Sequence, residues 1–175
     1  FPTRRSSDLG SALAPATMRD ILSMARRAGR KIMELVEKDI RPDKILTPAA
    51  FRNAIVIHSA IGGSTNALLH LPAIAGELGI ELDPELFNEI NRTIPHIGNI
   101  NPSGRHLTEA FWFAGGIPRV QLLLEKYLDL DVLTVTGRTL GENLEEIQKE
   151  HFLERGEGYL HNYGLDTEEV IFPLE

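Results

Sequence analysis

The sequence predicts a helix-rich α/β protein, and two observations lead to this class. Along most of the 175 residues, apolar side chains recur three and four positions apart between recognisable helix starts and stops. The stretch 131–136 differs, because Val132, Leu133, Thr134 and Val135 follow one another there. Such residues favour extended backbone, so the pattern indicates many helices and one short strand.

The first predicted helix spans 17–39, with Thr17 as its N-cap. Its apolar residues form one stripe at alternating steps of four and three. The stripe consists of Ile21, Ala25, Ala28, Ile32 and Leu35. The basic residues of this helix lie mostly on the other face, where we expect a solvated surface. They are Arg26, Arg27, Arg30 and Lys31.

Three further helices are predicted over 48–61, 64–78 and 84–93. Thr47, Ser64 and Asp83 precede them as N-caps, and Pro48 and Pro84 suit the first helical position. The helix over 48–61 is apolar on more than one side, which predicts deep burial.

The second half begins with an extended segment and a loop over 94–104. Helices are then predicted over 107–114, 118–127 and 140–153. The glycines at 156 and 158 are expected to break the last of these, and 166–174 to lead away from the fold. The aromatic triplet 111–113 is expected in the core.

Composition narrows the classes of function. The net charge is −7 and there is no basic run outside the first few residues, which argues against nucleic-acid binding. No apolar run is long enough to cross a bilayer and no signal peptide is present, so we expect a cytoplasmic protein. The chain has no cysteine, which excludes disulfides, thiolate nucleophiles and cysteine-ligated iron–sulfur clusters within it.

Residues 1–9 have no hydrophobic period and correspond to one reading frame of a common sequencing adapter. We interpret this segment as an artefact of sequence assembly, with a genuine flexible tail as the alternative. Glu175 follows what resembles a connection between domains. The chain is therefore expected to be an internal fragment of a longer protein.

The best candidate binding site is Gly62-Gly63-Ser64-Thr65-Asn66. Two glycines let a ligand or another backbone approach closely, and the next three side chains offer hydroxyl and amide groups. The start of the following helix would favour a carboxylate. The alternative is a tight corner between two helices with an ordinary serine cap.

Other motifs are weaker. Pro102-Ser103-Gly104 is a turn tripeptide, which is an ordinary feature on its own. The segment 134–139 lacks the spacing and the lysine of a Walker phosphate loop. No pair of histidines has the spacing of a helical zinc motif.

Four segments together resemble the dihydroxy-acid and sugar-acid dehydratase family, in its order and at about its spacing. They are 60–71, 101–104, 114–118 and 133–137. The resemblance implies that 10–137 forms the helix-rich C-terminal part of the family's N-terminal α/β domain. It implies that 138–175 is a linker helix and the start of the C-terminal barrel domain.

The resemblance also implies a reaction. Members of the family remove water from a 2,3-dihydroxy acid to give a 2-keto acid, using an iron–sulfur cluster and a magnesium ion. The cysteines, the modified lysine, the magnesium ligands and the catalytic serine are expected outside this chain, so we assign it no catalytic residue and no metal ligand. The substrate-binding residues that carry over are Gly62, Gly63, Ser64, Thr65, Asn66, Ser103 and Gly104.

The expected substrate is a sugar acid such as xylonate or arabinonate, or 2,3-dihydroxy-isovalerate. The triplet 111–113 before the glycine pair favours the sugar-acid branch. The family implies a homodimer or homotetramer, and this chain alone is expected to be inactive. Two alternatives stay open, namely a non-catalytic helical interaction module and a phosphate- or carboxylate-binding protein that uses 62–66.

Overall fold

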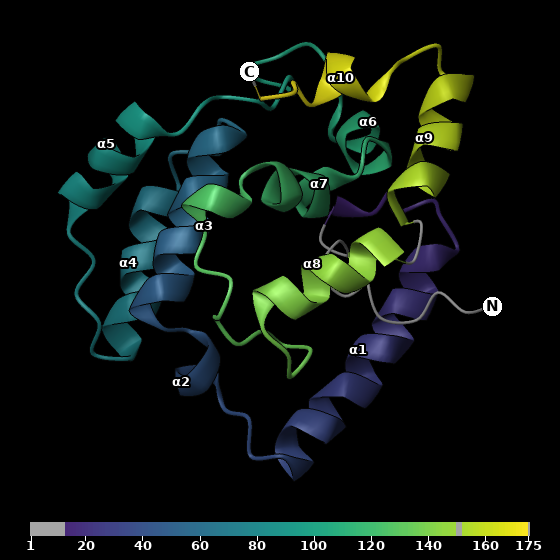
Figure 1. The fold of residues 1–175 in the computed structure, drawn as a ribbon. Coiled ribbons are helices and arrows are strands. Elements are labelled where there is room, and N and C mark those ends of the chain that lie inside the picture. Colours follow the sequence, from purple (N-terminus) through teal and green to yellow (C-terminus); the bar gives the residue numbers. More distant parts are fainter. Residues whose placement is uncertain (1–12, 150–151, 175) are drawn as a thin grey trace.

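The computed structural model of the chain describes residues 13–149 and 152–174. Within these ranges the fold consists of helices joined by turns and loops (Figure 1). The helices are α1 (Asp20–Glu37), α2 (Pro42–Ile45), α3 (Pro48–Ala60), α4 (Ala67–Glu77), α5 (Pro84–Thr93), α6 (Thr108–Phe113), α7 (Gly116–Leu123), α8 (Leu140–Lys149), α9 (Phe152–Asn162) and α10 (Thr167–Val170). None of the helices in the described ranges is long and apolar enough to span a membrane.

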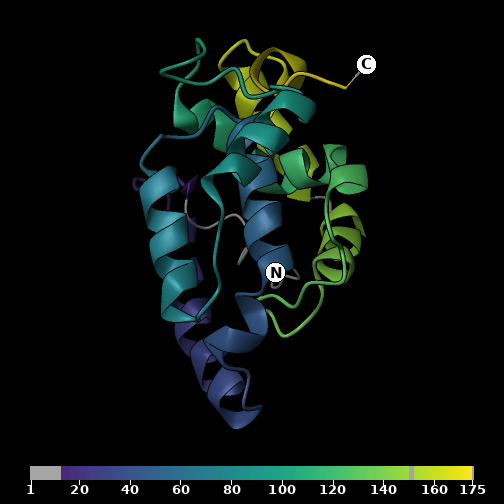
Figure 2. The same cartoon turned by 90° about the vertical axis from the view of Figure 1, so that its left-hand side faces the viewer.

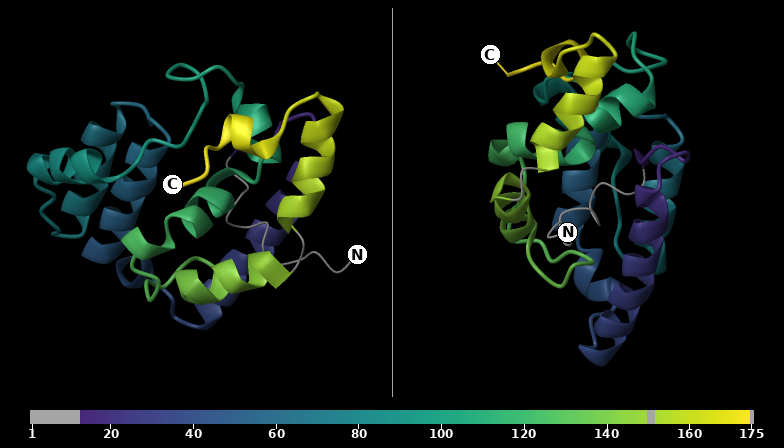
Figure 3. Two further views of the ribbon diagram at one scale, coloured as in Figure 1. Left: turned by 45° about the horizontal axis from the view of Figure 1, so that its top comes forward. Right: turned by 90° about the vertical axis from the view of Figure 1, so that its right-hand side faces the viewer.

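Helix α7 lies at the centre of the packing, where it contacts α3, α6 and α8. Helix α3 also contacts α5, and α9 contacts α6 and α8. Figures 1 and 2 show α3, α4 and α5 gathered at one end of the molecule. Figure 3 shows α1, α8 and α9 at the other end, with α6 and α7 between the two groups.

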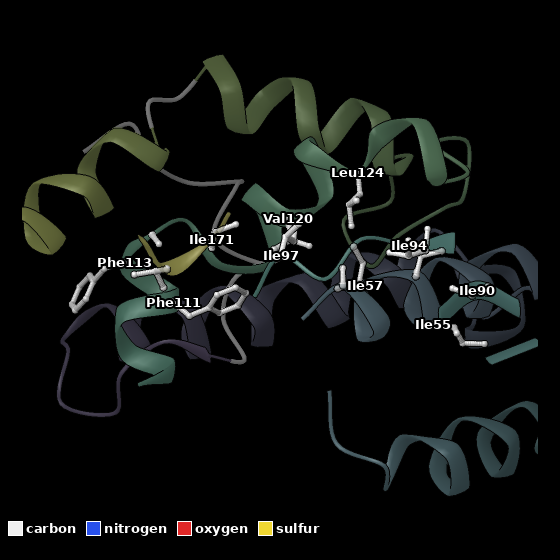
Figure 4. Packing of buried hydrophobic residues seen from close by; sticks show 14 of the residues in the cluster. Ile55, Ile57, Ile90, Ile94, Ile97, Phe111, Phe113, Val120, Leu124 and Ile171 are labelled. Carbon is white, nitrogen blue, oxygen red and sulfur yellow. The ribbon is translucent and has the colours of Figure 1, made fainter. Parts of the chain in front are cut away.

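One large hydrophobic cluster joins α3, α5, α6, α7, α9 and α10. Ile97, Val120 and Ile171 meet near its middle, although they come from a loop, from α7 and from the end of the described chain (Figure 4). Phe111 is fully buried in the same cluster, as the aromatic triplet predicted. A smaller second cluster lies beneath α8. The core therefore depends on contacts between segments that are far apart in sequence.

The helices with strong local signals agree with the predictions. Thr47 caps α3, its hydroxyl accepting the N–H of Ala50 at 3.2 Å. Asp83 caps α5, its carboxylate accepting the N–H of Glu85 at 2.8 Å. In both cases the cap and the following proline determine the start of the helix within a few residues.

The predicted cap at Ser64 is displaced. Helix α4 begins at Ala67, and its N-cap residue, Asn66, makes no side-chain capping hydrogen bond. The Ser64 hydroxyl instead accepts the N–H of Asn66 at 3.3 Å, within a turn that precedes the helix. Ser64 thus caps that turn.

The predicted strand over 131–136 is wrong. Leu133 forms only an isolated bridge with Thr139, and the described residues contain no extended strand. The side chain of Asn143, from α8, donates to the Thr134 hydroxyl at 2.8 Å and folds the segment into a tight turn. The α/β class therefore remains a prediction.

The predicted helix break over 155–158 is also wrong, because this segment lies inside α9. Gly156 sits against the backbone of Phe113, where a larger side chain would have no room. Arg119 forms an ion pair with Glu157, and the Phe113 ring stacks on Tyr159 at 5.3 Å between centroids. Packing against α6 and α7 overrides the weak helix propensity of glycine.

Helix α1 differs most from its prediction. It begins at Asp20 after Arg19, and Thr17 does not cap it. Met24 is buried, whereas Ile32 of the predicted stripe is 56% exposed. The basic residues of α1 line an open cavity shared with α8, where Arg26 and Arg30 are exposed and Arg27 and Lys31 are half-buried.

This orientation of α1 makes a prediction. Met24→Ala should lower the free energy of unfolding by about 2–3 kcal/mol, because it removes a buried side chain. Ile32→Lys should change it by less than about 0.5 kcal/mol, because the side chain is exposed. Urea unfolding of both variants measures the difference, and an equal cost at the two positions would contradict the orientation.

Candidate functional site

The site is built where α3 ends. The carbonyl of Ala60 accepts two backbone N–H groups, from Ile97 at 2.8 Å and from Gly98 at 3.1 Å. On the other side of this segment, Phe172 donates to the carbonyl of Ile97 at 2.9 Å. Residues 97–98 are therefore held between the end of α3 and the end of the described chain.

Gly98 permits this arrangement. A Cβ atom at this position would lie 2.9 Å from the Cα of Ile61, which is too close for any other residue. Gly98 also forms an antiparallel bridge with Ile171. The backbone of 97–98 thus lies directly against the last turn of α3.

This contact brings together the two motifs that the sequence singled out. Gly62 follows α3 with a positive φ of 63°, which favours glycine. A Cβ atom at Gly62 would lie 2.8 Å from both His96 Cε1 and Ser103 Oγ. Gly62 and Ser103, 41 positions apart in the printed sequence, therefore face each other.

His58, near the end of α3, contacts the glycine turn through its side chain and its carbonyl. Its Nε2 lies 2.9 Å from the carbonyl oxygen of Ser64, and its own carbonyl accepts the N–H of Gly63 at 2.9 Å. The imidazole ring lies against Gly63, so a side chain at that position would collide with it. Gly62 is thus needed where the turn meets the Ser103 loop, and Gly63 where it meets the His58 ring.

The turn leaves polar groups open. Within the described residues, the N–H groups of Ser64 and Thr65 donate to no protein acceptor, and both residues are exposed. Asn66 is exposed as well. Two adjacent amides and two hydroxyls at the start of α4 can together bind a carboxylate.

The Ser103 loop is closed by its own backbone. Asn101 donates to the carbonyl of His106 at 2.8 Å, and His106 donates to that of Asn99 at 3.1 Å. A Cβ atom at Gly104 would collide with the backbone of Asn99, so this glycine shapes the loop. Ser103 is exposed on the outside of the loop, and its Oγ donates to the carbonyl of Ile100 at 3.3 Å.

The structure brings Gly62 of the predicted site against Ser103, and the binding role of these residues stays a prediction. Two histidines that the sequence did not single out, His58 and His96, also contact the glycine turn. The signal for His58 was its position near the end of a helix, where a histidine can bond to nearby carbonyls. Nothing local in the sequence connects His96 with Gly62.

The residues present do not fit an iron–sulfur cluster or a magnesium ion. The chain has no cysteine. Among the described residues, no group of three histidine, aspartate or glutamate side chains could hold a metal. We therefore derive no chemical step through these cofactors from this chain.

Comparison with known proteins decides the family. The family described as dihydroxy-acid/6-phosphogluconate dehydratase N-terminal matches residues 7–143. The chain belongs to this family. The match includes the glycine turn, the Ser103 loop and the turn before α8.

Curated relatives agree with this assignment. The chain is 47% identical to a dihydroxy-acid dehydratase of Acetivibrio thermocellus over 138 residues, which is 78% of this chain and 25% of that protein. It is 41% identical to a dihydroxy-acid dehydratase of Methanothermobacter thermautotrophicus over 143 residues, 81% of this chain and 26% of that protein. The chain thus spans about a quarter of the length of the relatives it matches.

Gly62 offers a direct test of the site's geometry. Gly79 has a similar φ of 70° but has nothing near its Cβ position, so it is a matched control. Gly79→Ala should lower the free energy of unfolding by about 1–2 kcal/mol from backbone strain alone. Gly62→Ala should cost more, because the methyl group also meets His96 and Ser103.

Denaturant unfolding of the single variants and of Gly62→Ala combined with His96→Ala measures these costs. The double variant should recover part of the loss. Equal losses for Gly62→Ala and Gly79→Ala would show that the two loops do not meet.

Proposed function

We propose that this chain forms part of the substrate-binding wall of a dehydratase that converts a 2,3-dihydroxy carboxylic acid into a 2-keto acid. The observation that carries the proposal is the contact between the glycine turn at 62–63 and the Ser103 loop. Family membership supplies the reaction class, and the open polar groups supply the binding chemistry.

The roles of the residues follow from their positions. The N–H groups and hydroxyls of Ser64 and Thr65 bind the carboxylate of the substrate, helped by the positive end of the α4 dipole. Ser103 offers a hydroxyl to a substrate hydroxyl group from the facing loop. Asn66 lies beside them and offers an amide. Gly62, Gly63 and Gly104 keep the backbones close, and His58 positions the turn from behind.

The elimination itself requires groups that this chain lacks. The iron–sulfur cluster and magnesium ion typical of the family would supply Lewis-acid chemistry at the leaving hydroxyl and at the carboxylate end. This chain's part is to hold and orient the acid. We further propose that the whole protein acts in the cytoplasm as a homodimer or homotetramer.

The substrate is a sugar acid or a branched-chain dihydroxy acid. The aromatic triplet before the glycine pair at 115–116 favours the sugar-acid branch. The relatives named above are called dihydroxy-acid dehydratases, so both kinds of substrate belong in the test.

A segment exchange tests the proposal. The matching 138 residues of the Acetivibrio thermocellus protein are replaced by those of this chain, and 2-keto acid formation is measured with 2,3-dihydroxy-isovalerate, xylonate and arabinonate. We expect the chimera to turn over at least one of them. In that chimera, Ser64→Ala with Thr65→Ala should raise KM by about tenfold with a smaller effect on kcat, because hydrogen bonds to a charged group are lost.

Thr93→Ala is the control, because its hydroxyl bonds only to carbonyls of its own helix, α5. It should leave KM unchanged. A chimera that folds and retains its cluster absorbance, yet turns over none of the three acids, would contradict the proposal. That outcome would favour the interaction module.

A further inference from the structure

A cavity of about 870 Å³ lies between α1, the turn at 134–138 and α8, away from the Gly62–Ser103 site. Cationic side chains dominate its described lining. They are Arg26, Arg27, Arg30, Lys31, Lys38 and Arg138. Glu34 and Glu146 are the acidic residues of this lining.

The cavity lining is positively charged, although the chain as a whole is acidic. Six cationic and two acidic side chains give its described lining a net charge of +4, whereas the whole chain carries −7. One third of the 18 lysines and arginines therefore face one space. Five of the six lie within residues 26–38, which include the basic face predicted for the first helix, and the fold adds Arg138 from the turn before α8.

The α1 wall is one face of the helix. Arg26 and Arg30 are four residues apart, as are Arg27 and Lys31, so like charges are neighbours on the helix surface. Within the described ranges, the side chains of Arg26, Arg30 and Lys38 make neither a hydrogen bond nor an ion pair. Lys31 is paired with Glu34 on this face, so the repulsion is greatest between Arg26 and Arg30, and an anion bound there would relieve it.

The opposite wall is rigid. Asn143 is buried, and it donates to the Thr134 hydroxyl at 2.8 Å and accepts from the Thr136 hydroxyl at 2.8 Å. Arg138 is held by Glu146, with Nη1 and Oε2 2.6 Å apart. The turn thus presents the Arg138 guanidinium group across the cavity from α1.

We propose that this cavity is a binding site for a small phosphate-bearing anion with at least two negative charges, such as a diphosphate group. Four guanidinium groups favour phosphate oxygens, which match their planar geometry. The volume suits a small molecule. The cavity shares no residue with the Gly62–Ser103 site, so its ligand is distinct from the proposed substrate.

The probe is inorganic pyrophosphate, titrated into this chain by calorimetry in a metal-free buffer. Arg26→Gln with Arg30→Gln should raise the Kd for pyrophosphate at least about tenfold, since losing one charge-assisted hydrogen bond can weaken binding by about that factor. The matched control is Arg92→Gln with Arg105→Gln, which removes the same charge from exposed positions outside the cavity. It should leave affinity within about twofold.

Other outcomes would overturn the proposal. They are no binding to the unaltered chain, and equal losses in the two double variants, which would indicate a general charge effect. Tighter binding of a hexaglutamate peptide than of pyrophosphate would assign the surface to an acidic protein segment instead. Arg138→Gln, on the other wall, should also weaken binding, and Ser64→Ala with Ser103→Ala should not.

Discussion

The carbonyl of Ala60 is the acceptor on which the candidate site depends. Ala60 is fully buried at the end of α3, where an unpaired carbonyl would cost free energy. It is satisfied by the N–H groups of Ile97 and Gly98, which come from a loop almost 40 positions later. This requirement brings a distant segment to the end of α3 and, with it, the Ser103 loop.

Several features follow from that one contact. Gly98 must lack a side chain because its backbone lies against Ile61. The far side of the segment pairs with Ile171 and Phe172, so the end of the described chain joins the main core. The site therefore stands on buried, hydrogen-bonded backbone, while Ser64 projects into solvent. A rigid base beneath exposed polar groups is suited to orienting a small acid.

Local signals explain which elements could be predicted. Thr47 and Asp83 act through hydrogen bonds within three residues, so the sequence contains everything needed to place α3 and α5. The segment 131–136 has residues that favour strands. However, Asn143 forms a hydrogen bond to the Thr134 hydroxyl, and no partner strand exists in the described residues. Gly156 stays helical because of its contact with Phe113, which no local pattern reveals.

In the candidate sites too, features that depend on neighbouring residues could be predicted, and features that depend on distant contacts could not. The glycine turn could be found because its residue types are unusual side by side. Its contact with Ser103 could not be predicted from local sequence, because the hydrogen bonds of Ala60 that cause it are not local. The basic face of the first helix could be read from the sequence, but the cavity could not, since Arg138 meets that face only after folding. The outward turn of Ile32 was likewise hidden, because an apolar stripe normally predicts burial.

Native-state hydrogen exchange of the backbone amides measures the central contact most directly. If the Ala60 carbonyl holds the site together, the amides of Ile97, Gly98 and Phe172 should exchange only through global unfolding. Their opening free energy should equal that from denaturant unfolding, while Ser64 and Thr65 exchange rapidly. Exchange of Ile97 and Gly98 as fast as that of Ser64 would show that the loop is not held there, and the account of the site would be wrong.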